Sequence, residues 1–413
     1  MLSFHSRKHR HTTGEVVLIF DIGSGSVGAA LALISLSHKP ILLAAERAEM
    51  PFQDTIRAKR LQPLMLRALS QATLSLLAEG IPRVGLAARH LKVAGALFVL
   101  AAPWCSPRTE TLTLSQKEPI TITEDVISTL VQHADGENEK VLGSPDVPRR
   151  SLPQSEEQCE RILLSARLNG YETGMPIGKS ARTASFSFFQ SSAPRALLRA
   201  IGDTVAHFVH LRRIRFHSYA LSAFCALREL LSNTENFLFL DIGGEMTEAV
   251  IVREGELQEV FSFPVGRNHL IRALAKGTHS SPSAATGILA LSREEIVHPE
   301  KSGLTASLLN SFRDSWLSEL GQAAAHFSDT PSLPETTYLS GDDDCAELFA
   351  GFVRMRVPAG GASPSEAAPA VSILRADTFL SRLTTSTGSA ADSFLMLETV
   401  YASQLQQRNA LFA

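Results

Sequence analysis

The sequence predicts an α/β protein of two or three lobes that share a cleft, and three observations support this. The chain has 413 residues, well above the usual size of one domain. Apolar strands and helical patterns follow one another along its length. An apolar strand, an Asp-Ile-Gly turn and a second apolar strand occur twice, at Asp21 and at Asp241, 220 positions apart (241 minus 21). This spacing, about half the chain, indicates an internal repeat.

In the first half, a strand is expected over Glu15 to Phe20, and it leads through the turn that begins at Asp21 into a returning strand. Regularly spaced leucines predict a helix over Asp54 to Gly80, and a further strand is expected over Ala94 to Ala101. After this strand, alternating, strand-like segments are expected at Glu110 to Leu114 and Thr183 to Phe189. Between them, a helix is expected over Val126 to His133 and a flexible loop over Asp135 to Glu156. A second helix is expected over Ala193 to Leu211.

The second half repeats the plan. An apolar strand over Phe237 to Leu240 is followed by the second Asp-Ile-Gly turn and a returning strand over Glu248 to Arg253. Beyond these, helices are expected over His269 to Lys276 and Ala306 to Phe327, followed by a strand over Thr336 to Leu339. A Pro/Gly-rich loop is expected over Pro358 to Pro369, and a closing helix over Ala390 to Gln407.

The composition limits the possible classes of function. With 44% hydrophobic and 20% charged residues, the chain is typical of a soluble globular protein. A net charge of -3, from 39 basic and 42 acidic residues, gives no field that would attract nucleic acid or an anionic membrane. The cysteines form no CxxC pair, which indicates reduced thiols in a cytosolic protein. They are Cys105, Cys159, Cys225 and Cys345. Neither a signal peptide nor a membrane-spanning stretch is expected.

The two Asp-Ile-Gly turns are suited to binding phosphate. Glycines let backbone N–H groups approach a phosphate chain closely and form a concave anion site. Asp21 and Asp241 end buried strands and are expected to hold Mg²⁺ through water, since Mg²⁺ is usually bound by few carboxylates. The alternative is that both turns are ordinary tight hairpins in which the aspartate only caps the turn.

At these turns the sequence resembles the actin-like ATPases. DIGSGSVG resembles their first phosphate motif, DIGGEMTEAVIV their second, and YLSGDDD lies where their adenosine motif falls. The resemblance implies two lobes of duplicated, ribonuclease-H-like fold with ATP and Mg²⁺ in the cleft. It implies that phosphate and metal are held by Asp21, Gly23, Ser24, Gly25, Ser26, Asp241, Gly243, Gly244 and Thr247. Gly341 would back the adenosine, although the family usually has Gly-Gly where this chain has Gly341-Asp342.

Within that superfamily the chain resembles the branch of the cell-division protein FtsA and the pilus protein PilM. FSFPVGRNHLIRALA resembles the FtsA segment after the second phosphate turn, with Arg267 where glycine is more usual, and HSYALSAFCAL resembles the segment before it. The block from Val93 to Gln190 resembles the small α+β SHS2 subdomain that this branch inserts. The implied order begins with a disordered basic tail (1–14) and a first lobe in two parts (15–92 and 191–235), between which the insert lies (93–190). A second lobe (236–388) and a closing helix (389–413) follow.

The resemblance implies an ATP-binding scaffold that self-associates and binds a cell-division protein at the cytoplasmic face of the membrane. Membrane contact would be indirect, because only Arg408 adds a basic charge to the closing helix. Three alternatives remain open: a PilM-like component that binds the cytoplasmic tail of a membrane pilus protein, a small-molecule kinase of the superfamily, and a scaffold that has lost nucleotide binding, suggested by Arg267 and Asp342. No general base can be identified, so at most a slow ATPase is expected.

Overall fold

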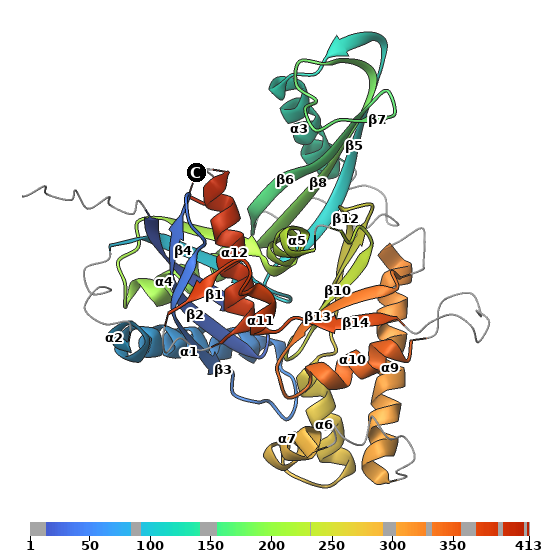
Figure 1. Ribbon diagram of the computed structural model, residues 1–413. Coiled ribbons are helices and arrows are strands. Elements are labelled where there is room, and N and C mark those ends of the chain that lie inside the picture. The colour runs from blue at the N-terminus through green and yellow to red at the C-terminus, as the bar shows by residue number, and fades with distance from the viewer. Residues whose placement is uncertain are drawn as a thin grey trace, which may run out of the picture.

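The computed structural model describes residues 14–83, 92–140, 155–231, 233–291, 303–327, 333–356, 369–386, 391–408 and 411–412. The expected basic tail lies outside the described residues except for Gly14, and so does nearly all of the loop expected at Pro358 to Pro369. Three sheets of six, five and four strands organise the described part of the chain (Figure 1).

The first sheet has the strand order β15-β3-β2-β1-β4-β9. Its strands are β1 (Gly14–Ile22), β2 (Ser26–Ser35), β3 (Ile41–Glu49), β4 (Val93–Leu100), β9 (Ile214–Ser218) and β15 (Thr384–Thr385). The first three form an antiparallel meander, and β4 and β9 continue the sheet in parallel with β1.

The second sheet repeats this topology in the order β12-β11-β10-β13-β14. Its strands are β10 (Phe237–Ile242), β11 (Thr247–Arg253), β12 (Glu256–Phe263), β13 (Thr336–Gly341) and β14 (Ala370–Ile373). Again three strands form an antiparallel meander, and two follow in parallel beside the first strand. The repeat seen in the sequence is therefore a duplication of a whole sheet, which confirms the predicted two-lobed α/β fold.

Helices cover both faces of each sheet, because the apolar strands bury both faces. One face of the first sheet packs against α1 (Ala58–Ser75) and α4 (Arg195–Ala206). Its other face packs against α5 (Tyr219–Leu230) and α12 (Ser393–Gln407), which also contact the second sheet. The outer face of the second sheet is covered by α6 (Arg267–Gly277), α7 (Pro282–Leu291), α9 (Leu304–Phe327) and α10 (Ala346–Arg354). Short helical segments are η1 (Leu76–Gly80), α2 (Ile81–Arg83) and α11 (Ala376–Phe379).

The third sheet belongs to an insert that projects from the lobes (Figure 1). It contains β5 (Ser106–Thr121), α3 (Glu124–Lys140), β6 (Glu156–Leu168), β7 (Tyr171–Glu172) and β8 (Ser180–Pro194), with the strand order β5-β8-β6-β7. Helix α3 packs on the sheet through a small apolar cluster around Phe186 and Ile122. The insert is thus a small α+β unit with its own core.

The expected boundaries differ from the observed ones at three places. Val93–Leu100 was expected in the insert, but as β4 it pairs with β1 and β9 in the first sheet, because this apolar strand is buried on both faces. Residues 384–385 pair with β3 in the first sheet, although they fall in the range expected for the second lobe. Helix α3 continues to Lys140, where a loop was expected from Asp135. None of the helices in the described ranges is long and apolar enough to cross a bilayer.

Candidate functional site

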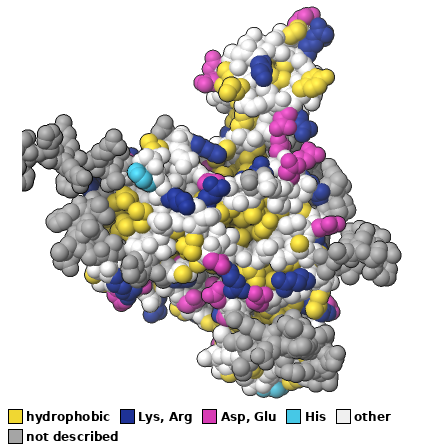
Figure 2. All heavy atoms as spheres, in the orientation of Figure 1, with side chains coloured by type: hydrophobic (Ala, Val, Ile, Leu, Met, Phe, Trp, Pro, Cys, Tyr) yellow, Lys and Arg dark blue, Asp and Glu magenta, His cyan; other side chains and the backbone are white. Residues whose placement is uncertain are grey.

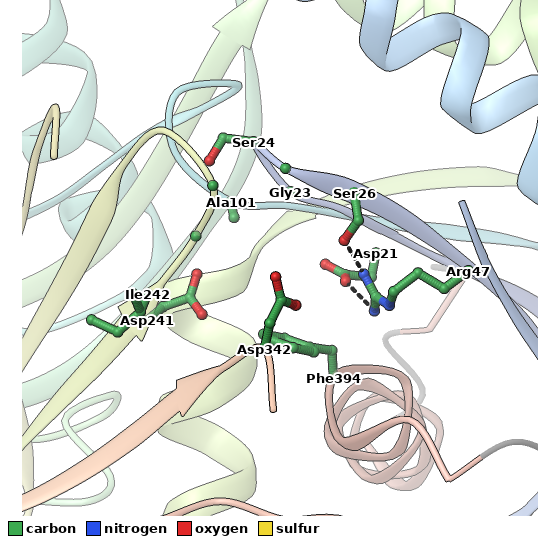
Figure 3. A pocket seen from close by; sticks show the side chains of 13 residues that line it. Asp21, Gly23, Ser24, Ser26, Arg47, Ala101, Asp241, Ile242, Asp342 and Phe394 are labelled. Atoms are coloured by element: carbon green, nitrogen blue, oxygen red, sulfur yellow. Dashed lines mark hydrogen bonds and ion pairs between the residues drawn. The ribbon is translucent and has the colours of Figure 1, made fainter. Parts of the chain in front are cut away.

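The two Asp-Ile-Gly turns adopt one geometry and lie opposite each other between the lobes (Figure 3). In the first turn the N–H of Gly23 donates to the carbonyl of Ser26 at 3.1 Å, and in the second the N–H of Gly243 donates to Met246 at 3.0 Å. The indole N–H of Trp104 donates to the carbonyl of Gly23 at 2.7 Å and braces the first turn. The duplication therefore extends from the sheets to the hydrogen bonds of the turns.

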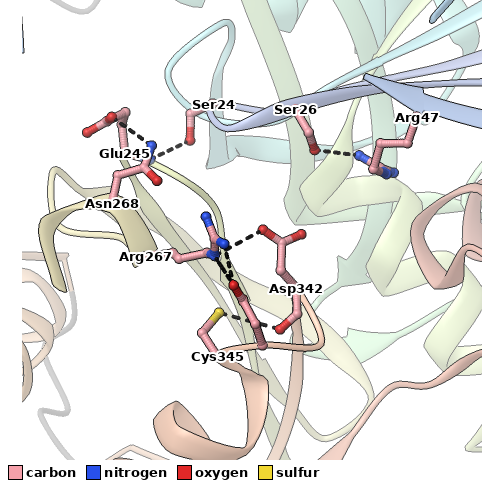
Figure 4. Close-up of polar contacts among 9 residues, drawn as sticks. Ser24, Ser26, Arg47, Glu245, Arg267, Asn268, Asp342 and Cys345 are labelled. Carbon is pink, nitrogen blue, oxygen red and sulfur yellow. Dashed lines mark hydrogen bonds and ion pairs between the residues drawn. The ribbon is translucent and has the colours of Figure 1, made fainter. Parts of the chain in front are cut away.

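The turns contact each other directly. The hydroxyl of Ser24 accepts a hydrogen bond from the backbone N–H of Glu245 at 2.9 Å (Figure 4). A Cβ on Gly25 would lie 2.9 Å from the Cα of Gly244, and one on Gly244 would lie 2.5 Å from the Cα of Gly25. Only glycine allows this approach, so these glycines bring two backbone segments of the chain together.

Eight of the ten site residues expected from the sequence line one small cavity at these turns. They are Asp21, Gly23, Ser24, Gly25, Ser26, Asp241, Gly243 and Gly244. Thr247 lies behind the second turn, where its hydroxyl donates to the carbonyl of Val265 at 2.6 Å. Gly341 ends β13 beside Ile242, but its neighbour Asp342 lines the cavity. The structure also places Arg47 and Phe394 in the lining, which sequence reasoning missed.

Arg47 of β3 binds the first turn and the start of α12 at once. Its Nη2 donates to Asp21 at 2.7 Å, its Nε to Asp392 at 2.7 Å and its Nη1 to the hydroxyl of Ser26 at 2.8 Å. The guanidinium also lies over the ring of Phe394, 5.0 Å from the centroid. Burial opposes the charged form, yet the two aspartates hold the pKa of Arg47 well above its usual value. No strand was predicted for ILLAAERAE, the segment that forms β3, so no signal in the sequence pointed to Arg47.

Asp392 is the N-cap of α12, and its side chain accepts from the N–H of Leu395 at 3.0 Å. Burial would raise the pKa of Asp392, but the charge of Arg47 and these hydrogen bonds lower it below the usual range. Burial raises the pKa of Asp21, against the opposing effect of Arg47. One arginine thus compensates two buried carboxylates.

Asp241, the second expected metal ligand, is 5% exposed and accepts a hydrogen bond from the hydroxyl of Ser340 at 2.6 Å. Burial, together with the charge of Asp21, raises the pKa of Asp241 to about 7, although the hydrogen bond from Ser340 partly offsets the rise. Glu248 lies opposite Asp241 in the β10–β11 pairing. Burial and the charge of Asp241 raise the pKa of Glu248 to about 8. The second turn therefore favours neutral carboxyl groups.

Arg267 forms a second ion-pair group where the adenosine motif was expected. Its Nε donates to Asp344 at 2.8 Å and lies 3.6 Å from the carboxylate of Asp342 (Figure 4). Burial raises the pKa of Asp342, while Arg267 counteracts this effect. The two positions at which the sequence departs from the family pattern, Arg267 and Asp342, are therefore paired with each other.

No protein-family model matches the sequence, and no curated protein sequence matches it. Solved structures do match the fold. A chain from a PilM–PilN type IV pilus biogenesis complex has 14% sequence identity and a TM-score of 0.60, and the match covers 95% of this chain and 98% of that one. The ethanolamine utilization protein EutJ from Carboxydothermus hydrogenoformans has 12% identity, covers 97% and 90%, and has a TM-score of 0.41. The first match and the duplicated topology show a two-lobed actin-like ATPase fold.

Proteins of this fold generally bind a nucleotide with Mg²⁺, but the cavity at the turns of this chain is too small to hold one. The cavity at the turns has a volume of about 30 Å³, room for one or two waters, whereas pockets for small ligands usually measure several hundred Å³. Within the described ranges, no group of three His, Cys, Asp or Glu side chains is arranged to hold a metal ion.

The charges of the cleft also oppose a nucleoside triphosphate. The lining carries three carboxyl groups, those of Asp21, Asp241 and Asp342, and the guanidinium of Arg47. Arg47 already pairs with Asp21, so the expected metal ligand has a cation of the chain beside it. Because Arg47 is shared between Asp21 and Asp392, the lining offers the phosphates of a nucleotide no uncommitted cation. As arranged here, these residues do not fit Mg²⁺-ATP.

Proposed function

We propose that this chain is an actin-like scaffold that works by binding other proteins at the cytoplasmic face of a membrane. The partner class is the cytoplasmic tail of a membrane-anchored pilus protein, a PilM-like role. The projecting insert, with an apolar tip far from the cleft, carries the proposal. The likeness over nearly the whole length to a chain of a PilM–PilN complex supports it.

Apolar side chains lie on the surface at the tip of the insert (Figure 2). Three large, exposed ones fall within seven residues of the sequence. Tyr171 is 80% exposed, Met175 79% and Ile177 54%. Exposed apolar groups gathered at one place mark interaction sites, and tyrosine and methionine are enriched in protein interfaces. The turn that holds them is built by Gly170 and Gly178, both with positive φ. These features support the tip as the docking surface for the partner.

ATP and Mg²⁺, the cofactors expected from the resemblance, have no part in this proposal, because the cleft residues do not fit them. The scaffold acts through its surfaces, and it reaches the membrane through its partner. The sequence resemblance to FtsA around Arg267 supports a second candidate, a self-associating division scaffold. Analytical ultracentrifugation and negative-stain microscopy separate the two: a monomer favours the pilus role, and filaments favour the division role.

The proposal is tested by measuring how strongly the protein binds a fluorescent peptide that carries the cytoplasmic tail of a PilN-type membrane protein. We expect saturable binding that weakens at least tenfold when Tyr171, Met175 and Ile177 are all changed to serine. A matched control changes Leu36 and Leu380, 61% and 51% exposed on the first lobe, to serine. Binding that is absent in the wild type, or equal in the tip variant and the wild type, contradicts the proposal.

A further inference from the structure

Beyond the turn–turn contact, the lobes are joined at a second place by Arg272 of α6. Its Nη1 donates to the carbonyl of Gln53 in the loop after β3 at 3.1 Å, and its guanidinium lies 5.6 Å from the ring centroid of Phe52. The same guanidinium pairs with Glu245 of the second turn. Phe52 packs against the core of the second lobe. Arg272 therefore ties the first lobe to the turn that closes on Ser24.

The insert makes a third connection between the lobes. It grows out of the first lobe, but its strands reach β12, the edge strand of the second sheet (Figure 1). The hydroxyl of Thr109 in β5 donates to the carbonyl of Gln258 at 2.6 Å. Ser165 in β6 donates to Glu256 at 3.1 Å. The insert thus links the first lobe to the edge of the second sheet.

An apolar core runs between the lobes below these polar contacts. One buried cluster includes the inner face of the first sheet, α5, α12 and the inner face of the second sheet. Tyr219 of α5, for example, lies 6.1 Å from Phe239 of β10, ring centroid to ring centroid. Opening the cleft would expose part of this core to water, which is unfavourable in proportion to its area.

We infer that the protein's own groups hold the cleft closed, so that the closed form is its resting state and needs no nucleotide. Arg47 pairs with Asp21 of the first phosphate motif, and Arg267 pairs with Asp342 of the expected adenosine motif. Each of these motifs therefore has a cation of the chain beside its aspartate. The contacts of Ser24, Arg272 and Thr109 hold the lobes at three places. This inference concerns how the two lobes are held, so it does not depend on which partner binds the insert.

Amide hydrogen exchange of the whole protein, followed by mass spectrometry, tests the inference at the two turns, residues 23–26 and 243–246. In the wild type we expect slow exchange without ligand, changed less than twofold by millimolar Mg²⁺-ATP. In Arg272→Ala, Gln53 and Phe52 lose their cross-lobe partner, and we expect both turns to exchange at least tenfold faster. Arg313→Ala is the control, because Arg313 pairs with the exposed Asp314 of its own helix.

Mg²⁺-ATP that slows exchange of the wild-type turns tenfold, or raises the melting temperature by several degrees, would overturn the inference, since a ligand that binds the folded state stabilises it. The inference would also be overturned if the turns of Arg272→Ala exchanged at the wild-type rate. The wild-type comparison needs no variant, so a failure of Arg272→Ala to fold leaves the test decisive. Binding of the partner peptide is measured separately and fails or succeeds independently.

Discussion

Arg47 donates to the carboxylate of Asp21 at 2.7 Å, so the residue that the sequence marks as a metal ligand is paired with a cation of its own lobe. The pair lies in β1 and β3 of one sheet, and the intervening β2 carries Ser26, which accepts a third hydrogen bond from Arg47. Because Asp392 shares the guanidinium, the first turn is also fixed to α12. This one side chain joins segments that lie 345 residues apart.

Replacing Arg47 by alanine should be strongly destabilising. It leaves Asp21 and Asp392 buried without their cation, and breaking a buried pair in this way costs about 3–5 kcal/mol. Urea unfolding at pH 7 measures this loss. Arg83→Ala is the matched control. The side chain of Arg83 is 49% exposed and pairs with Glu46 and Glu79, so a loss of stability of about 0–1 kcal/mol is expected. Equal effects of the two variants would contradict a structural role for Arg47.

Gly25→Ala should force the two turns apart. The new Cβ would meet the Cα of Gly244 at 2.9 Å, and backbone atoms cannot yield without moving a lobe. We expect a loss of about 1–3 kcal/mol, typical of an overpacked site, measured by thermal or urea unfolding. Gly287→Ala in α7 meets no atom within 4 Å, and helix propensity predicts a gain of up to about 1 kcal/mol there. A Gly25→Ala protein as stable as the wild type would show that the turns can separate freely.

The sequence predicted the fold well because the repeat is local in character. An apolar strand, a glycine turn and a returning strand depend on residues close together, and FDIGSGSVGAALALI and LDIGGEMTEAVIVRE both form the antiparallel hairpins that were predicted. The residue at which the insert begins was harder to predict from the sequence. Whether Val93–Leu100 joins the first sheet or the insert depends on pairing with β1, more than 70 residues earlier (93 minus 22 is 71).

The residues that line the cleft could be predicted from the sequence, but the ion pairs among them could not. Eight expected residues line one cavity, because two equivalent turns must meet when two equivalent lobes pack together. Arg47 and Asp392 could not be found from the sequence, since no local pattern links positions 345 apart. The departures at Arg267 and Asp342 were visible in the sequence, yet their mutual pairing became evident only in three dimensions.

Glu160 should fix the insert to the first lobe. Its Oε1 accepts hydrogen bonds from the N–H and hydroxyl of Ser218, at 2.9 and 2.6 Å, and from the hydroxyl of Ser191 at 2.9 Å. Ser218 is the N-cap of α5, so these bonds join β6 of the insert to a helix between the lobes. Glu160→Ala leaves buried donors unpaired and should cost about 2–4 kcal/mol. Glu160→Gln keeps an acceptor oxygen and should cost less; urea unfolding that ranks the two variants the other way would refute this role.

The stability of the protein should fall as the pH rises from about 5 to 8.5. Asp241 and Glu248 have pKa values raised to about 7 and about 8 in the folded state, whereas carboxyls in the unfolded chain titrate near pH 4. Between these values the folded state binds more protons than the unfolded state, so each step up in pH favours unfolding. Asp392, with its lowered pKa, has the opposite effect, but only at pH values below this window.

Urea unfolding of the wild type at pH 5.5 and pH 8.5, beside the Asp241→Asn, Glu248→Gln double variant, measures this dependence. Both replacements keep the shape of the side chain and remove its titration, and the asparagine oxygen can still accept from Ser340. We expect the wild type to lose on the order of 5 kcal/mol more than the variant between the two pH values. Because histidines and the other acidic groups are common to both proteins, the difference isolates the two carboxyls. A parallel pH dependence would mean that both carboxylates are ionised and compensated in the folded protein, and the burial argument for the second turn would fail.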